Sequence, residues 1–255
     1  MKTIKRDEYL DFLIRSKDKQ IIKVVSGVRR CGKSTLFEIY QDYLQKEGVD
    51  SQEIHTINFE NIDYEELTDY KKLYNYLKSR LITNKMNYIF LDEIQHVDKF
   101  EKVVDSLFIM KNVDIYITGS NSELLSGELA TLIAGRYFHI DVYPFSFKEF
   151  LQYKKEINSI DVKNKELQLF NEYVKYGGMP SLQQVQGIDK FSYLEDIYST
   201  ILLKDIISRH NLRNAEILNR ILTFIISNIG QPVSANGISK YLKHENLKVS
   251  ADTVL

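Results

Sequence analysis

The sequence predicts an α/β fold built on a parallel sheet and followed by a helical region. Across the first 145 residues, five short apolar runs typical of strands alternate with amphipathic segments typical of helices. This alternation favours a parallel sheet covered by helices on both faces. After about residue 146 no convincing strand pattern occurs, and apolar residues recur three and four positions apart, as they do in helices.

The individual elements follow from these patterns. The expected strands are Ile21–Val25, Ile54–Phe59, Tyr88–Leu91, Ile115–Thr118 and Tyr137–Val142. The expected helices of the first part are Asp7–Ile14, Lys33–Lys46, Asp69–Leu81 and Phe100–Met110. The spacings Asp98-x-x-Glu101 and Ser146-x-x-Glu149 are typical of capping boxes at helix starts.

The second part is expected to contain the helices Ser146–Tyr153, Lys165–Tyr176, Phe191–His210 and Ala215–Ile229. The last stretch predicts a helix, a short turn and the start of another helix, with Ser234 and Ser250 as caps. We therefore expect a core at 1–145, a helical region at 146–230 and an incomplete domain at 231–255 that continues beyond Leu255 in the natural protein.

Composition narrows the function classes. The formal net charge of −1 gives no bulk electrostatic indication of a nucleic-acid or membrane partner. No apolar stretch approaches the roughly 20 residues that span a bilayer, and the N-terminus lacks a secretory apolar segment. A single cysteine excludes an internal disulfide. We expect a cytoplasmic protein with no membrane partner.

Residues 27–34, GVRRCGKS, match the phosphate-binding loop pattern, and they stand between a predicted strand and a predicted helix. Gly27 and Gly32 allow the backbone N–H groups to approach phosphate oxygens, and the helix start adds its unpaired N–H groups and positive dipole end. Lys33 would reach the β- and γ-phosphates, and the Ser34 hydroxyl would ligate Mg²⁺. Strand and helix in these places disfavour a chance match, so the sequence predicts a nucleoside triphosphate site.

The expected nucleotide contacts are Gly27, Val28, Arg29, Arg30, Cys31, Gly32, Lys33, Ser34 and Thr35. Arg29 and Arg30 occupy variable loop positions, where exposure to solvent is as good an interpretation as contact with phosphate or a partner. Cys31 lies at a helix start, where the pKa of a thiol tends to fall. We interpret it as a small loop side chain and not as a redox switch.

Asp92 and Glu93 end a buried apolar run, at what would be the carboxyl edge of the sheet beside the nucleotide. Asp92 would hold Mg²⁺, directly or through its water shell, and Glu93 would accept a proton from the water that attacks the γ-phosphate. Alone such an acidic pair is a weak signal. Its place 59 residues after Lys33, with room for a helix, a strand and a second helix, strengthens it. A base beside the metal favours hydrolysis over phosphoryl transfer to a metabolite.

The polar end of the fourth apolar run, Ser120 and Asn121, could hydrogen-bond the γ-phosphate or the attacking water. Ser120-x-x-Glu123 is also a capping-box spacing, so these residues equally fit a helix start. Arg136 precedes the fifth strand, and its guanidinium could stabilise charge developing during phosphoryl transfer, although most arginines are surface residues. The histidines show no metal spacing with one another.

Four stretches, GVRRCGKST, FLDEIQ, TGSNSELLSGELATLIAGRY and PFSFKEF with the later YGGMP, resemble bacterial and archaeal AAA-type ATPases known mainly as predicted ATP-binding proteins. The resemblance implies a five-stranded P-loop core with strand order 5-1-4-3-2. It implies Walker A roles for Lys33 and Ser34, Walker B roles for Asp92 and Glu93, and a sensor role for Ser120 or Asn121.

The resemblance also supports a catalytic role for Arg136, because the Gly-Arg pair belongs to the family pattern. It implies ATP as the nucleotide; the sequence has no local motif of the guanine-selecting kind, so ATP follows from the family resemblance alone. It further implies that residues 231–255 begin a winged helix, which in this family precedes a nuclease-like domain. The present sequence matches only the opening of that winged helix, so the resemblance assigns no nuclease activity to it.

We therefore expect a Mg²⁺-dependent ATPase whose hydrolysis drives or times a conformational change in the C-terminal part. One alternative is a DNA-binding regulator that uses ATP only as a ligand, and another is a small-molecule kinase. A DNA or protein partner would use the C-terminal region, although the tail from Gln231 has few basic residues. The sequence leaves open whether the protein forms a homo-oligomer and whether Arg136 acts in cis or in trans.

Overall fold

The computed structural model describes residues 3–119, 135–185, 187, 189–201 and 215–244. The chain divides into two compact units, residues 1–190 and 191–255. The boundaries expected near residues 145 and 230 remain predictions.

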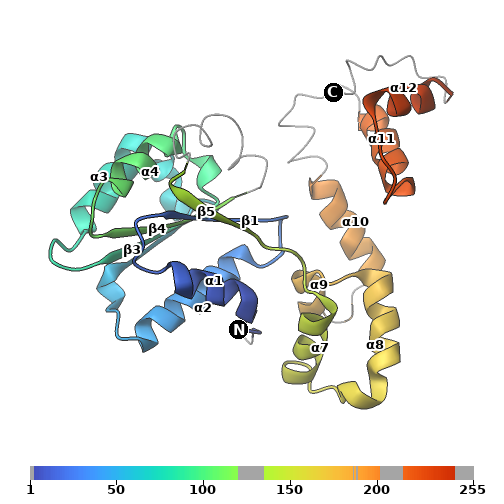
Figure 1. Cartoon of the computed structure of the whole chain (residues 1–255), viewed down its shortest axis with the longest axis horizontal. Coiled ribbons are helices and arrows are strands. Elements are labelled where there is room, and N and C mark those ends of the chain that lie inside the picture. The colour runs from blue at the N-terminus through green and yellow to red at the C-terminus, as the bar shows by residue number, and fades with distance from the viewer. Residues whose placement is uncertain (1–2, 120–134, 186, 188, 202–214, 245–255) are drawn as a thin grey trace. The chain divides into compact units, whose positions relative to one another are not determined.

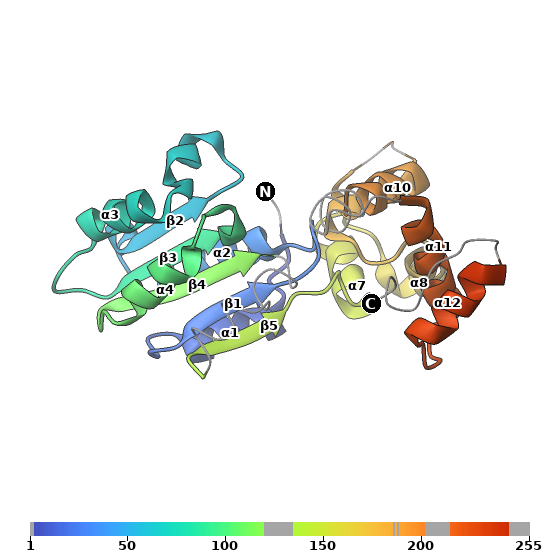
Figure 2. The ribbon, with the colours of Figure 1, turned by 90° about the horizontal axis from the view of Figure 1, so that it is seen from above.

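The first unit is built on a five-stranded sheet of order β2-β3-β4-β1-β5. All the adjacent strands run parallel, as Figure 2 shows from above. The strands are β1 (Ile22–Ser26), β2 (Ile54–Asn58), β3 (Asn87–Asp92), β4 (Val113–Gly119) and β5 (Tyr137–Asp141). The strand order predicted through the family resemblance is therefore confirmed, as is the parallel α/β class.

Helices cover both faces of this sheet (Figure 1), with α3 and α4 on one face and α1 and α2 on the other. Their bounds are α1 (Asp7–Ser16), α2 (Lys33–Lys46), α3 (Tyr70–Arg80) and α4 (Phe100–Phe108), and three short 3₁₀ turns lie at Ser51–Glu53, Ile62–Thr68 and Ile94–His96. Strand β3 shows why both faces are covered. Ile89 and Leu91 pack into the core under α3 and α4, whereas Tyr88 and Phe90 pack under α1 and α2.

A buried polar network crosses the sheet near the amino ends of its strands. The Lys23 ammonium forms an ion pair with the Asp114 carboxylate, and both side chains are fully enclosed. Asp114 also accepts hydrogen bonds from the Asp18 N–H at 2.9 Å and the Tyr116 hydroxyl at 2.8 Å. Burial lowers the pKa of Lys23 and raises that of Asp114, and the attraction between them opposes both changes.

Helices α7 (Phe147–Glu156), α8 (Val162–Tyr176) and α9 (Pro180–Gln184) complete the first unit. The predicted capping box at Ser146 and Glu149 is present at the start of α7. The one predicted at Asp98 is wrong, because α4 begins at Phe100 after Lys99, which caps it without a side-chain bond. Asp98 instead donates its N–H to the Thr68 carbonyl.

The second unit begins within α10 (Lys190–Thr200), after its first residue, and includes α11 (Ala215–Ser227) and α12 (Ala235–His244). Ser234 caps α12 as expected, because its hydroxyl accepts the Gly237 N–H at 3.1 Å. Apolar residues of α11 pack against Ile238 and Leu242 of α12. The predicted cap Ser250 and the last part of the helix expected at 191–210 lie outside the described residues. In the described parts of the chain, no helix has the length and apolarity that a membrane span requires.

Candidate phosphate-binding site

The loop between β1 and α2 has positive φ angles at its two glycines, Gly27 and Gly32. Gly27 has φ 148°, Gly32 has φ 101°, and Arg30 also adopts a positive φ of 64°. A Cβ at Gly27 would lie 2.2 Å from the carbonyl oxygen of Val142, so no larger residue fits there without a shift of the backbone. Because Lys33 begins α2 directly after Gly32, the amino end of the helix opens onto this loop.

The Lys33 side chain is folded back into the loop. Its ammonium donates to the Gly27 carbonyl at 3.0 Å and to the Val28 carbonyl at 3.4 Å. It also lies 3.3 Å from a carboxylate oxygen of Glu93, and both side chains are nearly enclosed. The structure thus brings together the predicted phosphate-binding lysine and the predicted base.

Asp92 ends β3 and is held by side chains from three other elements. Asn58 at the end of β2 donates to Oδ2 at 2.9 Å, and Thr118 on β4 donates to Oδ1. Burial raises the pKa of the Asp92 carboxyl, while hydrogen bonds from Ser34 and Thr118 oppose the rise. Asp92 and Ser34, the two residues predicted to hold Mg²⁺, are therefore direct neighbours.

Glu93 follows Asp92 in a left-handed conformation, φ 55°. Its N–H donates to the Thr118 hydroxyl at 2.9 Å, so Thr118 holds both acids at once. One carboxylate oxygen accepts Gln95 Nε2 at 2.6 Å and the other faces Lys33. A left-handed non-glycine residue in a buried turn is a strained arrangement, and such strain gathers at functional sites.

The variable loop positions differ in their surroundings. Val28 is exposed, and Arg29 forms an ion pair with Glu60 at 2.9 Å. Cys31 is fully buried, and burial raises the pKa of its thiol, which corrects the lower pKa expected at a helix start. Thr35 is half-buried in the first turn of α2, and Arg30 is exposed.

Arg136 is not part of this cluster. In the register of β1 with β5, Ile22 lies opposite Tyr137 and Ser26 lies opposite Asp141. Arg136 therefore stands opposite Ile21 at the amino edge of the sheet, about 20 Å along the strands from Gly27, where the loop starts. Its guanidinium pairs with Asp105 at 2.9 Å and is half exposed. Within one chain it does not reach the loop, so only action across a subunit boundary remains as a prediction.

Ser120 and Asn121 lie outside the described residues, so the sensor role stays a prediction. Sequence patterns missed three residues that the fold brings to the site, namely Thr118, Asn58 and Arg6. Thr118 and Asn58 share one signal that could have found them, because each is a polar residue near the carboxyl end of a parallel strand. Arg6 has no such signal, since it precedes the first helix.

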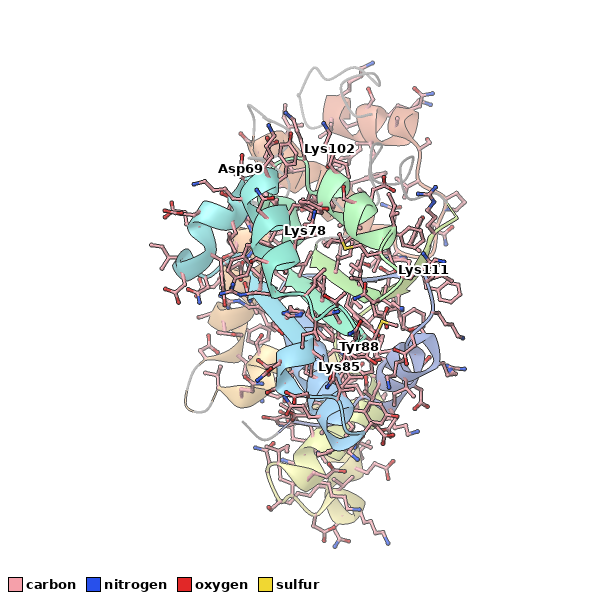
Figure 3. All side chains as sticks on the ribbon, turned by 90° about the vertical axis from the view of Figure 1, so that its left-hand side faces the viewer. Asp69, Lys78, Lys85, Tyr88, Lys102 and Lys111 are labelled. Carbon is pink, nitrogen blue, oxygen red and sulfur yellow. The ribbon has the colours of Figure 1, made fainter. Side chains whose placement is uncertain are left out.

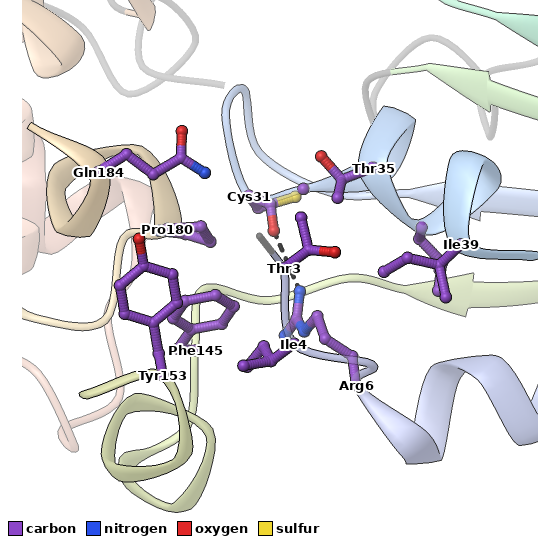
Figure 4. A pocket seen from close by; sticks show the side chains of 12 residues that line it. Thr3, Ile4, Arg6, Cys31, Thr35, Ile39, Phe145, Tyr153, Pro180 and Gln184 are labelled. Atoms are coloured by element: carbon purple, nitrogen blue, oxygen red, sulfur yellow. Dashed lines mark hydrogen bonds between the residues drawn. The ribbon is translucent and has the colours of Figure 1, made fainter. Parts of the chain in front are cut away.

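An apolar pocket adjoins the loop (Figure 4), and its walls come from the N-terminal segment, α2 and the helical part of the first unit. Its principal lining residues are Ile4, Leu36, Ile39, Phe145, Tyr153 and Pro180, and Cys31, Gly32 and Thr35 border it on the loop side. A second hollow lies between α3 and α4, on the side where Figure 3 labels Lys78 and Lys102, and it contains none of the predicted site residues.

In the described parts of the chain, no cluster of three or more His, Cys, Asp or Glu side chains could hold a metal ion. Asp92 and Ser34 instead offer hard oxygen donors beside the phosphate loop. That donor set fits Mg²⁺, which commonly keeps several waters and takes one or two carboxylates together with substrate phosphates. The residues present therefore fit a magnesium–nucleotide complex.

The sequence matches a known protein family and several known proteins. The AAA domain family matches residues 19–151, just over half of the chain, and a domain of unknown function matches residues 167–254. An uncharacterized protein of Haemophilus influenzae is 41% identical over 252 residues, which cover 98% of this chain and 62% of that protein. An uncharacterized protein of Methanocaldococcus jannaschii is 33% identical over 245 residues, covering 91% and 52%. The chain thus spans less than two thirds of the length of either relative.

Solved structures show looser similarity. The Aeropyrum pernix ORC1 protein in complex with DNA aligns with 99% of this chain and 81% of that chain, at 12% identity and a TM-score of 0.48. AMPPCP-bound DnaA from Aquifex aeolicus aligns with 97% and 83%, at 11% identity and a TM-score of 0.48. Similarity at this level carries no argument about function.

Proposed function

The chain belongs to the AAA domain family, and from that premise we propose that it binds ATP with Mg²⁺ and hydrolyses it at the loop between β1 and α2. The single observation that carries the proposal is the meeting of Lys33 with Glu93, 3.3 Å apart, beside Asp92 and the start of α2. Lys33 would bind phosphate, Asp92 would bind the metal and Glu93 would act as the base, and their closeness where β3 ends beside the start of α2 supports the proposal.

Mg²⁺ would be held by Ser34 and Asp92 and would neutralise charge on the phosphates. Asn58 and Thr118 support this role, because their hydrogen bonds fix the orientation of the Asp92 carboxylate. Supporting bonds of this kind tune metal ligands and are costly to remove.

Glu93 is the candidate base. The bond from Glu93 N–H to Thr118 holds its backbone, and Gln95 holds one carboxylate oxygen. The other oxygen shares the Lys33 ammonium with the loop carbonyls. A γ-phosphate would compete for the Lys33 ammonium. When the ammonium moves to the phosphate, the oxygen of Glu93 would be free to accept a proton from water.

The base and sugar would lie next to the apolar pocket beside Gly32 (Figure 4). Its apolar side chains suit the faces of a purine, and Thr3 and Gln184 at its rim offer polar groups to the ring edge. Both the N-terminal segment and the helices after β5 contribute walls. A ligand that contacts both can favour one arrangement of them, which supports the proposed switch in the helical part.

A cytoplasmic location and a homo-oligomeric state belong to the same proposal. The rival function is an ATP-liganded DNA-binding regulator, favoured by the compact α11–α12 pair with basic residues in the last turn of α12. The ATPase hydrolyses ATP repeatedly, whereas the regulator would bind ATP with little hydrolysis. A DNA titration at several salt concentrations tests the rival, since phosphate contacts produce a steep salt slope.

The direct test measures phosphate release from ATP without an added acceptor, with Mg²⁺ and again with excess EDTA. We expect turnover that requires the metal, and release only after an acceptor is added would instead indicate a kinase. Lys33→Ala should abolish ATP binding, with the exposed Lys46→Ala as control. Unchanged ATP affinity in Lys33→Ala would refute the assignment of the loop.

A further inference from the structure

We propose that Arg6 is a positioning residue that orients the phosphate loop and ties it to helix α7. Arg6 precedes the part of the chain that the AAA domain family matches, residues 19–151. Its side chain is 4% exposed, and its guanidinium reaches three separate segments of the first unit. The inference rests on the proposed nucleotide site and concerns how that site is shaped.

The first contact is with the loop. Arg6 Nη1 donates to the Cys31 carbonyl at 3.0 Å, the bond that Figure 4 shows as a dashed line. The peptide that joins Cys31 to Gly32 is trans and planar, so the Gly32 N–H points opposite to the Cys31 carbonyl. By holding that carbonyl on one side, Arg6 directs the Gly32 N–H to the other side.

The direction of the Gly32 N–H bears on anion binding. Gly32 is the residue directly before α2, and among the described residues its N–H donates to no protein acceptor. A phosphate-binding loop works by pointing such backbone donors at one anion. Arg6 therefore sets the direction of one of the donors that would contact phosphate, without touching the phosphate itself.

The other contacts lead to the start of α7. Arg6 Nε lies 2.8 Å from Glu149 Oε1, and Nη2 donates to the Tyr143 carbonyl at 2.8 Å. Glu149 also accepts the Ser146 N–H at 2.8 Å as part of the capping box of α7. The same carboxylate thus fixes the helix start and the guanidinium that orients the loop.

The arrangement needs an arginine. The planar guanidinium donates in three directions at once, and it lies 4.4 Å from the centre of the Tyr9 ring and 5.3 Å from that of Phe145. A lysine ammonium is a compact group that cannot span the Cys31 carbonyl, the Tyr143 carbonyl and Glu149 together. Arg6 also adopts φ 51°, a strained conformation that these contacts stabilise.

The test compares ADP affinity among four full chains: wild type, Arg6→Met, Arg6→Lys and Arg15→Met. Arg15 is the matched control, because its side chain on α1 is exposed and, among the residues that the structure describes, bonds only the Asp11 carbonyl of the same helix. We expect Arg6→Met to weaken ADP binding about tenfold, about 1.4 kcal/mol, and Arg6→Lys to weaken it by a smaller factor. Arg15→Met should bind as wild type does.

A second measurement separates positioning from mere stabilisation. Amide hydrogen exchange across Phe147–Glu156 should slow when ADP binds to wild type. In Arg6→Lys, ADP should still protect the loop amides but no longer protect α7. Glu149→Gln should lose the same protection of α7, and it serves as a further probe should Arg6→Met fail to fold.

Two results would overturn the inference. In the first, Arg6→Lys and Glu149→Gln melt at lower temperature yet bind ADP within about twofold of wild type and still protect α7, which makes Arg6 a structural residue only. In the second, Arg15→Met loses affinity as much as Arg6→Met. If wild type itself binds no ADP, both the proposed function and this inference are refuted.

Discussion

The Lys33 ammonium lies 3.3 Å from the Glu93 carboxylate, although 59 residues separate them in the chain. The two groups would play opposite parts in hydrolysis, one attracting phosphate and the other accepting a proton. Their contact means that the charge of each group is partly satisfied by the other. If a nucleotide binds here as proposed, its phosphates would have to replace this ion pair with contacts of their own.

This exchange predicts an unequal effect of Glu93→Gln on binding and turnover. The amide removes the charge that competes for Lys33, so ATP should bind as tightly as in wild type or up to several-fold more tightly. Turnover should fall by at least about 10², because a general base is lost. Titration with ATP and a phosphate-release assay measure both effects, and the exposed Glu38→Gln serves as control. Normal turnover in Glu93→Gln would remove Glu93 from the mechanism.

Gly27 should not tolerate a side chain. Gly27→Ala would place a Cβ 2.2 Å from the Val142 carbonyl oxygen, at φ 148°. We expect it to lower the free energy of unfolding by on the order of 3 kcal/mol and to impair nucleotide binding. Gly48→Ala is the matched control, since Gly48 has φ 92° with open space around it. It should cost about 1–2 kcal/mol through backbone strain alone. Equal losses in urea titrations would contradict the role of the close contact.

The buried pair of Lys23 and Asp114 should behave as a unit. Lys23→Met leaves an enclosed carboxylate without its cation, and we expect a loss of about 3–5 kcal/mol in the free energy of unfolding. Lys23→Met combined with Asp114→Asn removes both charges and should lose less than the two single variants together. Urea unfolding of the three variants checks this, and additive losses would show that the pair is not coupled.

Acid should weaken the bond between Arg6 and Glu149. Burial alone would raise the pKa of the Glu149 carboxyl, but hydrogen bonds from Arg6 and Ser146 outweigh it and hold the pKa below its ordinary value of 4.5. The stabilisation is therefore complete above pH 4.5 and is lost as pH falls through the lower pKa of the folded state.

Thermal melting of wild type and Glu149→Gln between about pH 6 and about pH 3 tests this dependence. Wild type should be the more stable at the upper end, and the difference should shrink toward the acid end. A difference that stays constant with pH would show that ionisation of Glu149 does not contribute to stability.

Arg136 should matter only between subunits. Because it stands at the amino edge of the sheet, Arg136→Ala should leave ATP affinity unchanged in a dilute monomer. If it acts in trans, the specific activity of wild type should rise with protein concentration, and that of Arg136→Ala should not. Equal activity of the two proteins at every concentration would exclude a catalytic role, and Arg220→Ala on α11 provides the control.

Local sequence predicted much of the fold because its signals are short-range. Alternating strand and helix patterns predicted the α/β class, and strand, loop and helix in succession predicted the phosphate loop. The family resemblance supplied the strand order that the structure confirms. The failed cap at Asp98 shows the limit of such signals, because its backbone bonds to Thr68 in another segment instead of starting α4.

The contacts that shape the site depended on tertiary structure. Thr118 meets Asp92 and Glu93 only because β4 lies beside β3, and Arg6 meets Glu149 across 143 positions of the chain. Neither the period of apolar residues nor a short motif carries information about such pairs. The Thr118 contacts arise because parallel strands bring their carboxyl ends to one edge. The contact of Arg6 with Glu149 arises because a buried guanidinium finds its hydrogen-bond acceptors in distant segments of the folded chain. The sequence by itself determined the strand, glycine loop and helix of the candidate phosphate-binding site, and the assembled sheet decided which side chains surround that loop.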